Sequence, residues 1–228
     1  MATAKEGIKQ KVHGWSHHDS ADLYGIDDWG NGYFRISKKG EVTVRLNDED
    51  GGKKDVSLCD LLEGLKERGT TVPVLFRFRD LLRSRIAELN DSFRKAIKEA
   101  GYQGKYQGVY PIKVNQQRQV VEEIAEFGTK YDYGLEASSK PELIAAMAHM
   151  HNPNAYLICN GYKDDEFIDL ALTAQKMGLN IFIVLEMPSE LDVIMERARR
   201  MDIRPNLGVR VKLAAKGSGL WQESAGDK

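Results

Sequence analysis

Apolar and polar residues alternate in two short runs near the amino terminus. Residues 33–37 and 41–46 place apolar side chains at every second position, and the turn between them ends at Gly40. This pattern predicts a β-hairpin. Residues 56–69 have apolar residues at helical spacing and end at a glycine, which predicts a short helix. The first 20 residues are polar and aperiodic, so we expect them to be mobile.

From Val72 onward, short runs rich in β-branched and aromatic residues alternate with longer amphipathic stretches. This alternation predicts βα units, so we divide the chain into an amino-terminal extension, 1–70, and a βα region, 71–228. Apolar residues at helical steps predict core-facing stripes. Two such stripes are Leu82, Ile86, Leu89, Phe93 and Ile97, and Leu191, Ile194, Met195 and Ala198. The expected strands cover residues 72–78, 107–115, 131–137, 155–160, 180–186 and 204–213.

The spacing of these strands favours a barrel. Strand starts at 107, 132, 155, 180 and 204 recur every 23 to 25 residues, as expected when each βα unit adds one stave. A doubly wound sheet usually carries a glycine-rich phosphate loop after its first strand, and residues 76–84 contain no glycine. We therefore expect an α/β fold, a (β/α)8 TIM barrel that is incomplete here, with about six βα units, and a chain that is truncated.

Composition limits the class of partner and the compartment. The 228 residues carry a formal net charge of −1, which gives no bulk attraction to nucleic acid or to an anionic membrane. The first residues lack the continuous apolar stretch of a signal peptide, and no later apolar run approaches the roughly 18 residues of a membrane span. Its two cysteines, Cys59 and Cys159, lack CxxC spacing. These features predict a cytoplasmic protein that acts on a small molecule.

Lys113 is the most informative single position. It lies near the carboxyl end of an expected strand, where the loops of a barrel build the active site. Partial desolvation there favours a neutral amine that can form a Schiff base with an aldehyde. Alternation puts Pro111, Lys113 and Asn115 on one face of the strand and Tyr110, Ile112 and Val114 on the other. Spacing alone leaves open a lysine that simply reaches into solvent.

Other polar residues have weaker signals. Arg210 and Lys212 share a face of the last expected strand and either attract a phosphate or carboxylate or pack against the outer helices. Ser139 with Glu142, and Ser189 with Asp192, have the spacing of helix capping boxes. The glycine loop 216–219 is a weak candidate for an anion. Histidines at 13, 17 and 18 are interpreted as solvated, and those at 149 and 151 as a polar helix end.

Three segments resemble one enzyme family. Residues 110–124 (YPIKVNQQRQVVEEI), 134–143 (GLEASSKPEL) and 29–34 (WGNGYF) are similar to the biosynthetic arginine decarboxylases. These are barrel-type, alanine racemase-like enzymes that depend on pyridoxal 5'-phosphate. The resemblance implies that Lys113 forms the internal aldimine with the cofactor and that Glu136 lies near that lysine. The residues alone leave Glu136 equally open to being a carboxylate paired at the barrel rim.

The resemblance also implies a reaction and missing parts. The expected activity is decarboxylation of L-arginine to agmatine, with Mg²⁺ as an accompanying ion whose ligands stay unassigned. Much of the family's active site follows the position of Lys228, and the family assembles as dimers or larger homo-oligomers. We therefore expect this chain to be inactive alone. The alternatives are a racemase or an ornithine, lysine or diaminopimelate decarboxylase, and a non-catalytic paralogue that binds a full-length decarboxylase.

Overall fold

The computed structural model describes residues 14–47 and 52–211. Its contacts divide the chain into two compact units, Met1–Ser84 and Arg85–Lys228, with the division inside helix α5 (Arg79–Ala100). Within the described residues, each unit contains one sheet. The domain limits expected from the sequence, 1–70 and 71–228, stay a prediction.

The first unit contains a three-stranded antiparallel sheet in the order β1 (Phe34–Ile36), β2 (Val42–Asn47), β3 (Lys53–Ser57). The predicted hairpin is confirmed, with Phe34 opposite Val44 and Ile36 opposite Val42. The third strand was not predicted. Lys53, Lys54 and Asp55 are all exposed, so this edge strand has no apolar face and no period of two.

In the described part of this unit, three short helices accompany the sheet. The predicted helix is confirmed as α4 (Leu58–Glu67). At its start, the Ser57 hydroxyl accepts the N–H groups of Cys59 and Asp60 and so caps the helix. The other two are α2 (His17–Leu23) and α3 (Ile26–Trp29). Within the first 20 residues, which were expected to be mobile, Ser16 and Asp19 form a capping box at the start of α2, and the mobility itself stays a prediction. His13 lies outside the described residues.

Residues 72–78 are not a strand, which corrects the prediction of six βα units. The segment pairs with no strand in the part of the chain that the structure describes, and Val72 and Leu75 are 65% and 75% exposed. The alternating aromatic side chains of this segment instead pack against other aromatic rings. The Phe78 ring lies 6.3 Å from the Phe34 ring of β1 and 6.3 Å from the Phe76 ring. A β-rich run becomes a strand only where a neighbour completes its hydrogen bonds, and this run packs through its side chains.

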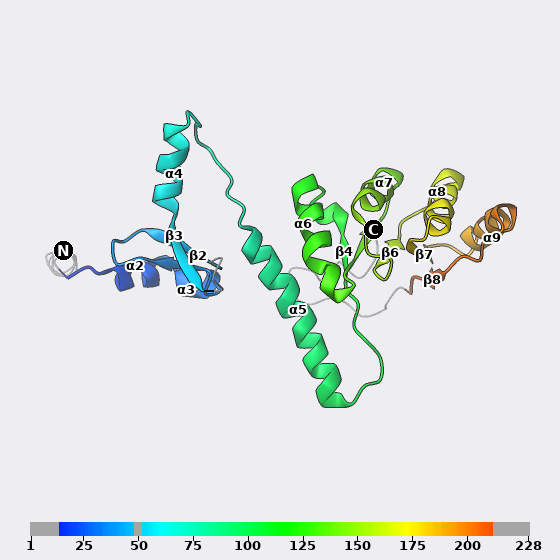
Figure 1. Ribbon diagram of the computed structural model, residues 1–228, viewed down its shortest axis with the longest axis horizontal. Coiled ribbons are helices and arrows are strands. Elements are labelled where there is room, and N and C mark those ends of the chain that lie inside the picture. The colour runs from blue at the N-terminus through cyan, green and yellow to red at the C-terminus, as the bar shows by residue number, and fades with distance from the viewer. Residues whose placement is uncertain (1–13, 48–51, 212–228) are drawn as a thin grey trace, which may run out of the picture. The chain divides into compact units, whose positions relative to one another are not determined.

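The second unit is a five-stranded parallel sheet whose strands follow one another in sequence order (Figure 1). Sequential order without reversal is the arrangement of consecutive barrel staves, so the incomplete barrel is confirmed with five strands. The strands are β4 (Val109–Pro111), β5 (Gly134–Ala137), β6 (Tyr156–Cys159), β7 (Asn180–Leu185) and β8 (Leu207–Val209). The connecting helices are α6 (Arg118–Gly128), α7 (Lys140–His149), α8 (Asp165–Lys176) and α9 (Glu190–Met201), with short 3₁₀ turns η1 (Ile112–Val114) and η2 (Thr129–Tyr131).

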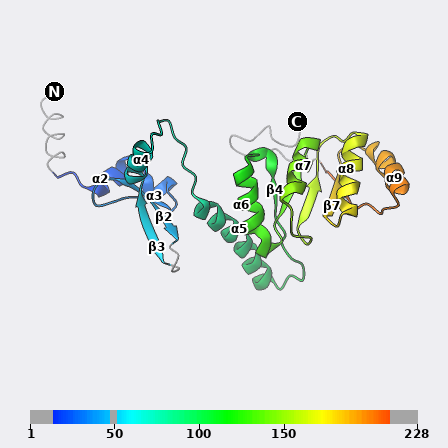
Figure 2. The same ribbon diagram turned by 45° about the horizontal axis from the view of Figure 1, so that its top comes forward.

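The two faces of this sheet differ. Helices α6 to α9 lie along one face (Figure 2), and in β5, β6 and β7 alternate strand side chains are buried beneath them. This core contains Leu135, Ala137, Leu157, Cys159, Ile181 and Ile183 from the strands, each at 0% exposure. The alternate positions lie on the opposite face, where Ile158 and Val184 are half-buried and the rings of Tyr156 and Phe182 meet at 5.1 Å. Functional side chains on this opposite face are therefore separated from the core that the helices cover.

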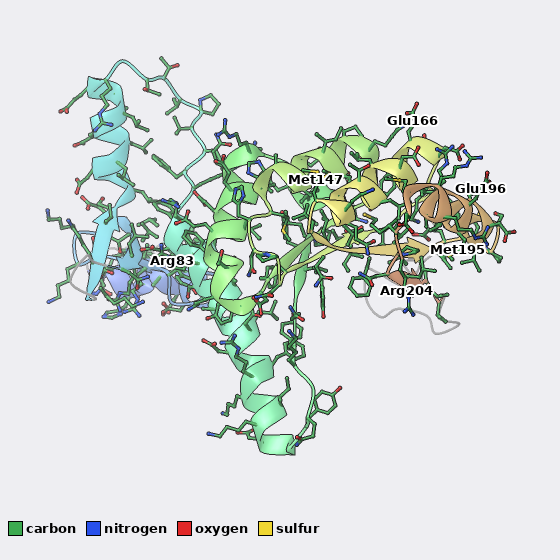
Figure 3. The ribbon with its side chains drawn as sticks, turned by 45° about the vertical axis from the view of Figure 1, so that its right-hand side comes forward. Arg83, Met147, Glu166, Met195, Glu196 and Arg204 are labelled. Atoms are coloured by element: carbon green, nitrogen blue, oxygen red, sulfur yellow. The ribbon has the colours of Figure 1, made fainter. Side chains whose placement is uncertain are left out.

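The predicted helical stripes are confirmed only in part. In α9, Ile194 and Ala198 are buried as expected, whereas Leu191 is 40% exposed. In α5 only Ile86 of the stripe is buried, and Phe93 is 45% exposed although its ring stacks on Tyr106 at 3.9 Å. The outer helix faces carry charge, as Glu166 of α8 and Glu196 of α9 show (Figure 3). Within residues 14–47 and 52–211, no helix has the length and apolarity needed to cross a bilayer.

Candidate functional site

Lys113 directly follows the carboxyl end of β4. The strand stops at Pro111, and Ile112 to Val114 form a 3₁₀ turn anchored by Ile112, which is 1% exposed. The predicted alternation is therefore wrong beyond Pro111, because the turn leaves Val114 70% exposed. The Lys113 side chain is 57% exposed, so its expected desolvation is not seen among the described residues.

Glu136 lies beside Lys113 on the face of the sheet opposite helices α6 to α9. The parallel register of β4 and β5 places Pro111 opposite Glu136, so the lysine two residues later comes within reach of the carboxylate. The Lys113 Nζ and Glu136 Oε1 atoms are 3.9 Å apart, and Glu136 is only 5% exposed. The Ser138 hydroxyl donates to the same Oε1 atom at 2.7 Å. The structure thus brings both sequence-predicted site residues together, and their chemical roles stay predictions.

The loop after β5 is tied to the loop that carries Lys113. The Ser139 hydroxyl accepts the Glu142 N–H at the start of α7, as predicted. The Glu142 carboxylate accepts the N–H of Ser138 at 2.7 Å and the side-chain amide of Gln116 at 3.2 Å. Glu142 therefore links two loops, which the prediction of a capping role alone did not include.

A second charged pair stands at the far end of the same edge. Glu186 follows β7 and Arg210 follows β8, and the guanidinium donates to both carboxylate oxygens at 3.1 Å. Burial raises the pKa of Glu186, but hydrogen bonds from the Gly161 N–H and from Arg210 outweigh burial and leave this pKa lowered. Arg210 is thus an anchored cation at the carboxyl edge. Lys212 and the glycine loop 216–219 lie outside the described residues.

The sequence reasoning missed a buried ion pair behind this edge. The Lys163 side chain is 0% exposed and its Nζ lies 3.5 Å from Oε2 of Glu190, which is 4% exposed. The same Nζ donates to the Gly161 carbonyl at 2.6 Å. Burial lowers the pKa of Lys163, opposed chiefly by the charge of Glu190. The local signal for this pair in the sequence is a lysine shortly after one strand and a glutamate shortly after the next.

Glu190 also binds backbone amides near the start of α9, where a different cap was predicted. Ser189 makes no side-chain capping bond, so the predicted box with Asp192 is wrong. The Glu190 carboxylate instead accepts the Glu186 N–H at 2.8 Å and the Lys163 N–H at 3.2 Å. A buried carboxylate binds these amides more strongly than a hydroxyl does, because the acceptor is charged.

Cys159 gives a direct test of burial at this edge. Burial raises the pKa of its thiol to about 12, with Glu136 adding to the rise and Lys163 opposing it. At pH 8 such a thiol is on the order of 10⁻⁴ thiolate. We expect iodoacetamide to alkylate exposed Cys59 at least about 100-fold faster than Cys159 in the native protein, as measured by peptide mass spectrometry. Both should react alike in guanidinium, and equal native rates would contradict the burial of Cys159.

Two of the hollows beside the helices are lined by residues that bear on the predicted sites. One of about 450 Å³ lies at the carboxyl edge and is lined in part by Ser138, Tyr162 and Lys163. The other, of about 760 Å³, lies between α6 and α7 and is lined in part by His149 and His151. His149 Nδ1 is 3.9 Å from Glu122 Oε1 there, so this histidine faces a carboxylate at the helix end. Among the described residues, no group of three His, Cys, Asp or Glu side chains could hold a metal ion.

Comparison with known proteins gives consistent matches. Residues 84–228 match the family model described as "Pyridoxal-dependent decarboxylase, pyridoxal binding domain". The chain is 50% identical over 214 residues to the biosynthetic arginine decarboxylase of Gloeobacter violaceus, covering 94% of this chain and 33% of the relative. It is 46% identical over 213 residues to that of Aeromonas hydrophila, covering 93% and 34%. The chain thus spans about a third of the length of the curated relatives it matches.

Solved structures agree with the sequence matches. The biosynthetic arginine decarboxylase of Campylobacter jejuni superimposes with a TM-score of 0.74 at 38% identity, covering 84% of this chain and 31% of that one. A diaminopimelate decarboxylase from M. jannaschi superimposes with a TM-score of 0.55 at 21% identity, covering 82% and 37%. The second likeness supports the fold alone.

Proposed function

This chain belongs to the pyridoxal-dependent decarboxylases, and from that premise we propose that it forms part of an enzyme that decarboxylates L-arginine to agmatine and carbon dioxide. The observation that carries the proposal is the Lys113 amine at the carboxyl edge of a parallel sheet, 3.9 Å from the buried Glu136 carboxylate. The names of the relatives with 46% and 50% identity support arginine as the substrate.

The residues present fit pyridoxal phosphate. An accessible primary amine is the group that an aldehyde cofactor requires, and Lys113 is 57% exposed on the face of the sheet opposite the helices. When bound, the cofactor withdraws the electron pair that remains on Cα after carbon dioxide leaves. The Glu136 carboxylate lies 3.9 Å from the Lys113 amine and can pair with it. Lys113 therefore supplies both the attachment point and an exchangeable proton.

Arg210 is the proposed anion-binding group of this edge. Its guanidinium is held by Glu186, which in turn accepts the Gly161 N–H, so the cation has a fixed position. An Arg at this edge suits a phosphate or a carboxylate, since its planar donors can bind two oxygens at once. The side chain is 42% exposed, which leaves donors open toward solvent.

The experiment uses the protein expressed at its full length with added pyridoxal phosphate. We expect release of carbon dioxide from arginine and little from ornithine, lysine or diaminopimelate. Borohydride reduction should fix a pyridoxyl group on the peptide that contains Lys113. Activity on another of these amino acids would instead identify a different decarboxylase of the same fold. Absence of both activity and the reduced adduct would favour the non-catalytic paralogue.

Three further properties belong to the proposal. We infer that Mg²⁺ accompanies the cofactor and that the full-length protein is a homo-oligomer, both on the resemblance to the family. We also infer a cytoplasmic location, supported by the two free cysteines. Metal analysis of the purified protein, its mass in solution and cell fractionation test these properties one by one.

A further inference from the structure

Ser138 lies where several hydrogen bonds near Lys113 meet, and the proposed reaction gives this residue no role. It follows β5 directly, and its hydroxyl donates to Glu136 Oε1 at 2.7 Å, the same oxygen that lies 3.9 Å from Lys113 Nζ. A carboxylate oxygen with one short donor has a preferred orientation. The Ser138 hydroxyl therefore determines which oxygen of Glu136 faces the lysine.

The backbone of Ser138 is itself fixed from the Lys113 side. Its N–H donates to Glu142 Oε2 at 2.7 Å, and Glu142 Oε1 accepts from the Gln116 amide at 3.2 Å. Gln116 follows Lys113 by three residues. The contacts thus close a ring from Lys113 through Glu136, Ser138 and Glu142 to Gln116 and back along the chain.

The neighbouring loop packs against the same residue. Gly161 has a φ of +75°, and a Cβ atom there would lie 2.6 Å from the Ser138 carbonyl oxygen. The Gly161 N–H donates to Glu186 at 2.9 Å, and the Gly161 carbonyl accepts from the buried Lys163 amine. Ser138 is therefore held by its own helix start and by the adjacent βα loop.

A helix-capping function does not account for the Ser138 hydroxyl. The N-cap of α7 is Ser139, whose hydroxyl accepts the Glu142 N–H at 3.4 Å. The Ser138 hydroxyl donates to a carboxylate that is 5% exposed and belongs to the preceding strand. These two adjacent serines therefore have different tasks.

We propose that Ser138 is a positioning residue that orients the Glu136 carboxylate toward the Lys113 amine. This inference deepens the proposed function and rests on it for the relevance of Lys113 to the reaction. The hydroxyl holds Glu136 in one rotamer, so that a negative charge stays beside the amine through the reaction cycle. Without it, the carboxylate samples orientations in which the amine loses its partner.

The test measures the reactivity of Lys113 in full-length protein freed of cofactor. Trace acetic anhydride competes for the amines, and mass spectrometry quantifies acetylation of the Lys113 peptide. We expect S138A to raise this acetylation about threefold to tenfold, because a loosened carboxylate no longer holds the amine in an ion pair. S138T, which retains the hydroxyl, should restore the native rate. S139A is the matched control and should lower the melting temperature without changing acetylation of Lys113.

A double-mutant cycle with E136Q tests the route of the effect. If Ser138 acts through Glu136, S138A adds nothing to the acetylation rate in the E136Q background. With cofactor restored, S138A should lower kcat about tenfold with little change in KM for the amino acid, and S138T should recover it.

The outcomes separate this inference from the proposed function. Acetylation of Lys113 that is equal in S138A and S139A overturns the inference, as does an S138T protein that behaves as S138A. The same holds if S138A raises acetylation equally in the E136Q background. If borohydride reduction fixes no pyridoxyl group on Lys113, that result contradicts the proposed function instead. The acetylation data from cofactor-free protein remain valid in that case.

Discussion

Lys113→Ala in the full-length protein should lower decarboxylation by roughly 10³-fold or more and abolish borohydride fixation of pyridoxal phosphate. The amine at position 113 lies beside a 5% exposed carboxylate, and alanine removes both the nucleophile and the exchangeable proton. Product formation and peptide mass spectrometry after reduction measure the two effects. Affinity for the cofactor should fall as well, which fluorescence titration detects.

Lys140→Ala is the matched control. Lys140 begins α7, and its amine contacts Asp164 and Glu166, both at 2.7 Å, on a side chain that is 36% exposed. Loss of these two surface ion pairs should change stability little and leave decarboxylation near the native rate. A Lys140→Ala protein that lost the reduced adduct while Lys113→Ala kept it would contradict the assignment of Lys113.

Lys163→Ala and Glu190→Ala should each lower the free energy of unfolding by about 3 to 5 kcal/mol. The Lys163 and Glu190 side chains are 0% and 4% exposed, so removal of either leaves a buried charge without its partner. The loss should be similar for the two, although Glu190 also accepts the Glu186 N–H. Denaturant unfolding followed by circular dichroism measures the loss in free energy of unfolding for each variant.

Two further variants make this second prediction decisive. The double substitution Lys163→Met with Glu190→Leu removes both charges and should recover a large part of the stability. Glu196→Ala breaks an exposed pair with Arg200 on α9 and should change stability by no more than about 1 kcal/mol. If Lys163→Ala cost as little as Glu196→Ala, the pair would not be buried in the folded protein.

The sequence predicted the parallel units well because each one is periodic over its own length. The runs 155–160 and 180–186 became β6 and β7, whose alternate residues Leu157 and Ile181 are 0% exposed. Lys113 and Glu136 could be found since both stand where strands end, at the edge that parallel strands share. Their separation of 3.9 Å required the register, which no local pattern contains.

What the sequence did not predict depends on tertiary partners. Residues 72–78 have the composition of a strand, and only the packing of Phe76 and Phe78 shows that their alternation serves aromatic contacts. The Lys163–Glu190 pair joins residues 27 positions apart, and neither residue type is typical of a core. The capping pattern at Ser189 has no side-chain bond in the structure, and the adjacent Glu190 instead accepts the Glu186 N–H before the helix.

Sequential strand order has a consequence for biosynthesis. Lys113, Gln116, Glu136, Ser138 and Glu142 all lie within 30 consecutive residues, and α7 ends at His149. Contacts between neighbouring βα units close short loops, which form quickly compared with pairings between distant parts of a chain. A nascent chain that has emerged from the ribosome as far as His149 therefore carries every member of the Lys113 ring, long before translation reaches Arg210.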